Sequence, residues 1–226
     1  KFIINGGRPL KGKIAVSGSK NAALPILCAA LLADSVSTFE NVPDIEDIRS
    51  LLEIFQDLGV KITKNKNTIT IDPENLKDKE PKKNLIQKMR ASILIAPPLL
   101  IRFQKLNMEF PGGCVLGKRP LAAHTYVFKK FGAKILEQEK ALKVIIPAKS
   151  TIDTADSGTA PSGTATNQTV NQIIIMPEAS VTATENALMF AAATHGRTEI
   201  HLAACEPHVQ DLCDVLNKMG AKISGI

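Results

Sequence analysis

Aromatic residues are scarce in this chain. Tryptophan is absent, tyrosine occurs once, and aromatic residues make up 4% of the 226 positions. The lysines and arginines are spread along the chain, with no basic block denser than short runs such as Lys82-Lys83. Proteins that bind nucleic acid use stacking aromatics or clustered basic patches. The sequence therefore argues against a nucleic-acid partner, and a basic nucleic-acid binder is the least supported of the functions considered.

Metal-binding and membrane motifs are also missing. The four cysteines form no C-x-x-C pair and have no histidine at zinc spacing, so no metal site is predicted. The longest apolar stretch, residues 91–101, is too short to span a bilayer and contains two prolines. The chain opens on Lys-Phe-Ile-Ile, with no apolar signal region. We expect a cytoplasmic protein with no membrane partner.

The bulk composition is that of an ordinary globular protein, 44% hydrophobic and 22% charged. A chain of this length can form one or two domains with a sizeable core. The net charge of +6 favours an anionic ligand, and small phosphorylated metabolites fit this as well as nucleic acid does.

An internal repeat dominates the sequence. Three similar segments, at 58–62, 131–135 and 219–223, each place a glycine after an apolar residue and before a Lys-Ile pair. Glycine at a helix end tolerates the left-handed conformation that ends the helix. Periodicity predicts helices at 22–32, 43–58, 90–101, 121–131, 183–194 and 206–219, and strands at 38–42, 60–63, 68–72, 107–110, 133–136, 142–146 and 198–202. We therefore predict an α/β fold of three repeated helix–strand–helix–strand–strand units around one core.

Three segments fall outside this repeat. Short strands are predicted at 2–4 and 13–17, before the first unit. Residues 150–172 are mostly Ser, Thr, Ala, Gly and Asn, which predicts a flexible surface insertion. The third unit stops at Ile226 before its final strand, and we expect this polypeptide to be part of something longer.

A glycine-rich stretch at 110–120 carries the first candidate for chemistry. Its three glycines allow close approach to a ligand, and Cys114 lies shortly before Lys118 and Arg119. Neighbouring cations favour the thiolate, the reactive form of cysteine. The alternative is a glycine-rich turn that happens to contain a cysteine.

The other candidate binding residues lie at the N-termini of predicted helices. Lys20 and Asn21 follow Gly-Ser at one opening, Arg90 and Arg119 stand at two others, and residues 180–182 offer hydroxyls at a fourth. Free N–H groups at helix starts attract anions, so we predict a polyanion site at one shared end of the domain. Two alternatives stay open: Lys20 is a solvated residue beside a helix cap, and Arg90 pairs with a carboxylate rather than a phosphate.

The four histidines have no Ser, Cys or Asp at the local spacing of a catalytic triad. We interpret them as structural or solvated: His124, His195, His201 and His208.

Four motifs together resemble the UDP-N-acetylglucosamine 1-carboxyvinyltransferase family of enolpyruvyl transferases. They are Ser-Gly-Ser-Lys-Asn-Ala-Ala-Leu-Pro-Ile at 17–26, Met-Arg-Ala-Ser at 89–92, Pro-Gly-Gly-Cys with Gly-Lys-Arg-Pro within 111–120, and Ser-Val-Thr-Ala-Thr-Glu-Asn-Ala at 180–187. The family has two domains, each an inside-out barrel of three such units, with the active site between them. The resemblance implies that residues 20–226 form only the domain with the cysteine loop, and that residues 1–19 pack on the absent C-terminal half.

The resemblance also implies the reaction. Family members transfer the enolpyruvyl group of phosphoenolpyruvate to the 3-hydroxyl of UDP-N-acetylglucosamine and release phosphate, the first committed step of peptidoglycan synthesis. The addition–elimination chemistry needs no metal or organic cofactor. A single half is expected to have little activity alone, because the facing domain supplies further site residues.

Site residues follow from the resemblance position by position. Cys114 is implied as the proton donor, Lys20 and Asn21 meet phosphoenolpyruvate and the sugar nucleotide, and Arg90 supports the site. The implied lining of the UDP-sugar site is Arg119, Pro120, Leu121, Ala122, Ala123, Glu178, Ala179, Ser180 and Val181.

The chain departs from the family pattern in three places. Glu178 stands where many relatives carry lysine, Thr182 stands where glycine is usual, and Ala122 and Ala123 stand where an acidic residue is often found. These departures motivate the alternative hypothesis, a non-catalytic sugar-nucleotide-binding or regulatory module on the same fold.

Overall fold

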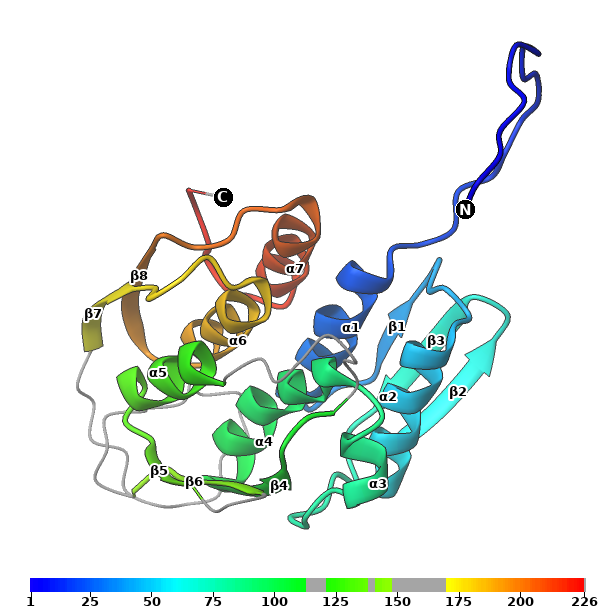
Figure 1. The fold of residues 1–226 in the computed structure, drawn as a ribbon. Helices are drawn as coiled ribbons and strands as arrows, with labels where there is room; N and C mark the ends of the chain where they lie inside the picture. Colours follow the sequence, from blue (N-terminus) through cyan, green and yellow to red (C-terminus); the bar gives the residue numbers. More distant parts are fainter. Residues whose placement is uncertain (113–120, 138–140, 148–169, 226) are drawn as a thin grey trace.

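Helices occupy the middle of the molecule and small sheets lie around them (Figure 1). The computed structural model describes residues 1–112, 121–137, 141–147 and 170–225. The helices are α1 (Lys20–Ala29), α2 (Glu46–Asp57), α3 (Lys83–Ile86), α4 (Ala96–Phe103), α5 (Ala122–Lys130), α6 (Val181–Ala192) and α7 (Pro207–Lys218), with 3₁₀ segments η1 (Ala30–Leu32) and η2 (Arg90–Ile95). The strands are β1 (Ser37–Phe39), β2 (Lys61–Asn65), β3 (Thr68–Asp72), β4 (Lys105–Glu109), β5 (Lys134–Glu137), β6 (Ala141–Ile145), β7 (Val170–Ile175) and β8 (Gly196–His201). The α/β prediction is confirmed.

The first two sheets have the same topology. Strand order is β1-β3-β2 in one and β4-β6-β5 in the other, and all pairs are antiparallel. Each sheet therefore places the second hairpin strand in the centre and leaves the first strand of its unit at an edge. The third sheet is different, because β7 and β8 pair in parallel, with Val170 opposite Gly196. Closure of three units into a barrel stays a prediction.

Local patterns explain the helix ends. Gly59, Gly132 and Gly220 all have positive φ, between 80° and 109°, immediately after helices α2, α5 and α7. This is the conformation that the repeated exit pattern predicted. At the end of η1, Arg102 of α4 donates to the carbonyls of Leu31 and Ala33, which satisfies acceptors that a helix end leaves open.

Helix α6 lies in the centre of the core. Residues 183–190 are all buried, and the helix packs against α4, α5, α7 and η2. Phe190 stacks on Phe131 with ring centroids 5.0 Å apart and meets Phe128 edge to face at 5.7 Å. A helix buried on every side must satisfy its polar residues internally. Within the described residues, no helix is long and apolar enough to cross a membrane.

Two strand predictions are wrong. Residues 2–4 and 13–17 form no strand, and residues 1–19 extend away from the helices (Figure 1). A strand needs a partner edge, and residues 1–19 pair with none of the edge strands in the described part of the chain. Conversely, β7 begins at Val170, inside the segment 150–172 predicted as a flexible insertion. Its pairing with β8 brings these residues into a sheet, whereas residues 148–169 lie outside the described chain.

Candidate functional site

Lys20 stands at the first position of α1, where the predicted anion site begins. Gly18 is required just before it, because a Cβ at this position would lie 1.8 Å from the carbonyl oxygen of Asn41. Ser19 caps the helix by accepting the Ala22 N–H at 3.4 Å. Nζ of Lys20 lies 2.9 Å from Oδ2 of Asp47 on α2, and the Lys20 side chain is 47% exposed. An anionic ligand at Lys20 would therefore compete with a carboxylate that is already in place.

The neighbouring Asn21 is exposed at the second position of α1. Pro25, one turn later, has no N–H, so the Asn21 carbonyl lacks the donor four residues further on that it would have in a regular α-helix. The side chain of Asn21 is thus accessible at the N-terminus of α1.

Arg90 begins η2 and is half-buried. Arg90 interacts electrostatically with His124 of α5. Burial is the main reason why the pKa of His124 is lowered to about 3, and the positive charge of Arg90 lowers it further. His124 is therefore neutral at physiological pH, and Arg90 provides the positive charge in this part of the core.

His124 links the N-terminal parts of α5 and α6 through hydrogen bonds. Nδ2 of Asn186 lies 2.9 Å from Nδ1 of His124, and Oγ1 of Thr182 lies 3.3 Å from Nε2. Because an amide nitrogen donates, Nδ1 is the acceptor, and Nε2–H of the neutral ring donates to Thr182. Asn186 is fully buried, and its Oδ1 has no hydrogen-bond partner among the described residues.

Glu185 is the second ionisable group buried here, at 1% exposure. Burial, reinforced by the charge of Glu206, raises the pKa of Glu185 to about 8. Burial and Glu185 in turn raise the pKa of the Cys28 thiol on α1. Thr184 donates to the Ser180 carbonyl at 2.9 Å and accepts the Ala204 N–H at 3.1 Å. We call His124, Thr182, Thr184, Glu185 and Asn186 the α6 polar cluster.

The residues implied for the UDP-sugar site lie at both ends of this arrangement. Before α5, the half-buried Leu121 accepts the Thr125 N–H at 2.9 Å. Ser180 is the N-cap of α6 and accepts the Ala183 N–H at 3.4 Å. The exposed members of the set are Ala122, Glu178 and Ala179, Ala123 is buried, and Val181 is half-buried.

Cys114, Arg119 and Pro120 lie outside the described residues. The start of their loop is placed, however. A Cβ on Gly112 would lie 2.0 Å from the carbonyl oxygen of Gln87, and the Gly112 N–H reaches the Ile86 carbonyl at 3.5 Å. The glycine thus lets the backbone pass directly against the segment that leads into Arg90.

The structure brings together only part of the predicted set. Packing of η2, α5 and α6 gathers Arg90, the residues before α5 and the opening of α6. The described contacts of Lys20 instead lead to α2, although α1 also packs against η2. Sequence reasoning missed Glu185 and Asn186, for which a polar Thr-Glu-Asn run inside an otherwise apolar helix was the available signal.

The positions of the histidines agree with a structural or solvated role, which stays a prediction. His124 is buried and hydrogen-bonded, whereas His195 and His201 are exposed and His208 is half-buried. Across the residues that the structure describes, no group of three or more His, Cys, Asp or Glu side chains could hold a metal ion.

Comparison with known proteins decides the family. The family model for EPSP synthase (3-phosphoshikimate 1-carboxyvinyltransferase) matches residues 4–226. The chain belongs to the EPSP synthase family. It is 41% identical over 225 residues to a UDP-N-acetylglucosamine 1-carboxyvinyltransferase of Borreliella burgdorferi, and 40% identical over 227 residues to one of Treponema denticola. These alignments cover 100% of the chain but 48% of each relative, so the chain spans about half the length of the curated relatives it matches.

Solved structures confirm an EPSP synthase-family fold. The enolpyruvyl transferase NikO from Streptomyces tendae matches with a TM-score of 0.75 at 22% identity, over 97% of this chain and 47% of that one. EPSP synthase from Acinetobacter baumannii matches with a TM-score of 0.62 at 20% identity, over 91% and 43%.

Proposed function

We propose that this chain is the cysteine-loop half of a UDP-N-acetylglucosamine 1-carboxyvinyltransferase. In the complete enzyme the sugar 3-hydroxyl attacks C2 of phosphoenolpyruvate while C3 gains a proton. The tetrahedral intermediate then loses phosphate through cleavage of the C2–O bond to the phosphate and loses a proton from C3, which re-forms the C2–C3 double bond of the enolpyruvyl group. The observation that carries the proposal is the 41% identity to an enzyme of this name over the whole chain.

Each residue has a role in this proposal. Cys114 delivers the proton to C3, and Lys20 and Arg90 compensate the phosphate and carboxylate charges that reorganise in the transition state. Val181, the first residue of α6, offers its N–H group to the diphosphate of the sugar nucleotide, and Ser180 offers its hydroxyl. Gly112 supports the assignment of Cys114, because its backbone lies against the segment before Arg90, two residues from the cysteine.

A split-enzyme assay tests the activity. The C-terminal half of the Borreliella burgdorferi relative is supplied as a separate polypeptide, and phosphate release is measured with phosphoenolpyruvate and UDP-N-acetylglucosamine. We expect release from the mixture and negligible release from either half alone. Cys114→Ser should remove the activity, whereas the matched control Cys205→Ser, at an exposed cysteine, should keep it. Normal turnover by the isolated chain would refute the half-enzyme proposal.

A chemical probe tests the site without turnover. The chain is incubated with UDP-N-acetylglucosamine and an epoxide phosphonate, and the modified peptide is mapped by mass spectrometry. We expect alkylation of Cys114, with Cys28 and Cys213 protected by burial. Modification at Cys205 instead would contradict the assignment.

Residues 1–19 are proposed to pack on the other half of the enzyme. Large apolar side chains in this segment are fully accessible, for example Phe2 at 95% and Leu10 at 98%. Apolar surface of this kind marks an interaction site. Removing residues 1–17 should abolish co-purification of the two halves, while the remaining domain keeps its thermal unfolding midpoint. Undiminished co-purification would count against this role.

The alternative, a non-catalytic sugar-nucleotide-binding module, has structural support of its own. Lys20 already pairs with Asp47, and Thr182 is hydrogen-bonded to His124 at a position where relatives often have glycine. Calorimetry separates the two hypotheses. A module binds UDP-N-acetylglucosamine equally well with and without the complementary half and gains no activity from it.

A further inference from the structure

Asp47 on α2 holds the side chain of Lys20 on α1. Its Oδ2 lies 2.9 Å from Nζ of Lys20, although the two residues are 27 positions apart in the chain. The side chains of Lys20 and Asp47 are 47% and 40% exposed, and an exposed ion pair contributes little to stability. What this pair determines is therefore where the ammonium group lies, rather than how stable the fold is.

The start of α1 offers Lys20 no compensating charge of its own. Lys20 is the first residue of the helix, where the helix dipole is positive, and the first turn contains no acidic residue. The long, flexible stem of a lysine allows its ammonium group to move away from such a helix end into solvent. In the part of the chain that the structure describes, the carboxylate that pairs with Lys20 is that of Asp47.

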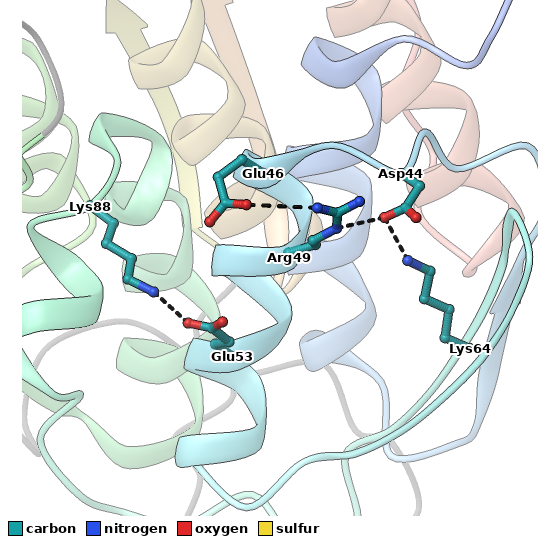
Figure 2. Close-up of polar contacts among 6 residues, drawn as sticks. All are labelled: Asp44, Glu46, Arg49, Glu53, Lys64 and Lys88. Atoms are coloured by element: carbon teal, nitrogen blue, oxygen red, sulfur yellow. Dashed lines mark hydrogen bonds and ion pairs between the residues drawn. The ribbon is translucent and has the colours of Figure 1, made fainter.

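Asp47 is itself held on a rigid element. It lies in the first turn of α2, where the helix dipole favours a carboxylate, and the next residue, Ile48, is buried in the core. The two other acidic residues near this helix start pair with Arg49, Asp44 at 2.8 Å and Glu46 at 3.9 Å (Figure 2). Asp47 instead pairs across to α1.

The backbone also brings the two helix starts together. A Cβ on Gly18 would lie 3.2 Å from Cδ of Pro43, in the segment that leads into α2. The chain two residues before Lys20 therefore packs on the chain four residues before Asp47. One backbone contact and one ion pair thus fix Lys20 relative to α2.

The ion pair leaves Lys20 able to bind an anion. An ammonium group has three N–H donors, and the bond to Asp47 uses one of them. The negative charge of Asp47 opposes the binding of an anion at Lys20. The fixed position of the two remaining donors, in contrast, favours the charge distribution of a transition state that they are placed to meet.

We propose that Asp47 is a positioning residue of the transferase. It holds Nζ of Lys20 in the place from which this ammonium group compensates the charge on phosphoenolpyruvate. Asp47 acts through Lys20 and itself touches no substrate. The inference rests on the proposed function, because that function supplies the substrate that Lys20 meets.

The kinetics of the split enzyme test this role. Asp47→Asn removes the charge and keeps the size of the side chain, so kcat should fall about tenfold. KM for phosphoenolpyruvate should change by less than about threefold, because lost orientation and lost repulsion oppose each other in binding. Asp47→Glu should restore most of the rate, and the matched control Glu46→Gln, which removes the adjacent carboxylate, should leave both constants unchanged. An unchanged kcat in Asp47→Asn, or an equal loss in Glu46→Gln, would overturn the proposal.

A double-mutant cycle determines whether Asp47 acts through Lys20. Lys20→Met alone should lower kcat about a hundredfold, and the addition of Asp47→Asn should lower it no further. If the two losses multiplied to about a thousandfold, Asp47 would act independently of Lys20, which contradicts the proposal.

A measurement on the 226-residue chain alone separates this inference from the proposed function. NMR of ¹⁵N-labelled lysine ammonium groups gives an order parameter for each Nζ. The value for Lys20 should fall in Asp47→Asn, whereas Lys88, paired with Glu53 at 2.6 Å, should keep its value. No phosphate release from the wild-type mixture would refute the transferase and with it the role of Asp47. Release from that mixture, with the order of Lys20 unchanged in Asp47→Asn, would overturn the role of Asp47 alone.

Discussion

Two groups of charged and polar side chains in this molecule follow opposite electrostatic rules. The first lies on the surface around α2 and joins it to its neighbours (Figure 2). Asp44 is bonded to Arg49 at 2.8 Å and to Lys64 at 2.7 Å, and nearby Lys88 of the following unit pairs with Glu53 at 2.6 Å. The second is the α6 polar cluster, which contains His124 and Glu185 but no charge that water can reach.

The pKa of a carboxyl group shifts in opposite directions in the two places. Hydrogen bonds from Arg49 and Lys64 lower the pKa of Asp44 to about 2, whereas burial raises the pKa of Glu185 to about 8. Solvated partners favour the ionised carboxylate, and desolvation favours the protonated form. The surface group therefore consists of charges and the buried group of neutral hydrogen-bonding residues, and their contributions to stability should differ in size, pH dependence and salt dependence.

The largest expected difference is in stability. His124→Ala removes a buried ring and leaves Thr182 and Asn186 without their partner, so the free energy of unfolding should fall by about 2–4 kcal/mol. Lys88→Ala removes an exposed ion pair and should lower the free energy of unfolding by less than about 1 kcal/mol. Equal effects of the two substitutions in urea denaturation would remove the basis of the comparison.

The next effect is a loss of stability as the pH rises toward 8. The pKa of Glu185 is about 8 in the folded chain against 4.5 as its reference value, so the folded state holds a proton that the unfolded state releases. Stability from this group therefore falls as pH rises from 4.5 to about 8, by up to about 1.4 kcal/mol per pH unit. Below 6.5, the reference pKa of histidine, His124 opposes this slope, because its pKa is lowered.

Glu185→Gln isolates this contribution. Urea denaturation between about pH 6.5 and pH 8 should show a falling stability in the wild-type chain and a flatter profile in the variant. The slope is compared rather than the absolute stability, because a buried glutamine near Cys28 and Glu206 shifts the level as well. Parallel profiles would show that Glu185 is not protonated in the folded state.

Lowering the pH should remove the stability contributions of the two groups over different pH ranges. The pKa of Asp44 is lowered from 3.8 to about 2, so its contribution is complete above 3.8 and is lost as pH falls toward 2. The pKa of His124 is lowered from 6.5 to about 3, so its loss begins at higher pH. Asp44→Asn should therefore flatten the stability profile only below about pH 4. A change confined to the region above that pH would assign the wrong group.

These differences also mark how far the sequence could predict the structure. The helix-ending glycines and the strands of units one and two were predictable because the signal is local: a periodic run followed by a residue with positive φ. β7 was missed because its partner β8 lies 26 residues away, and the predicted polar insertion overlapped its first residues. Likewise, Lys20 was placed correctly at a helix start, but nothing near it in sequence indicated Asp47, which lies 27 residues further on.

The candidate site shows the same limit. The α6 polar cluster joins α5 to α6 through contacts between residues 58 and 62 positions apart, so no local motif could reveal that His124 is held by Thr182 and Asn186. What the sequence did indicate was the motif at each helix opening. Tertiary packing then decided which of these helix N-termini lie close together. Segments η2, α5 and α6 pack in the core, whereas Lys20 at the start of α1 contacts α2 instead.

The smallest expected effect is that of salt, and it bears on the surface group alone. Raising NaCl from about 0.05 M to about 0.5 M shortens the screening length and should reduce the difference in stability between wild type and Glu53→Gln, which removes one charge of the Lys88–Glu53 pair. The difference between wild type and His124→Ala should not change, because neutral hydrogen bonds in the interior are not screened. Urea denaturation at both salt concentrations measures the two differences side by side. A salt-dependent His124 difference would mean that the buried cluster carries a charge after all, with Arg90 as the group that interacts with it.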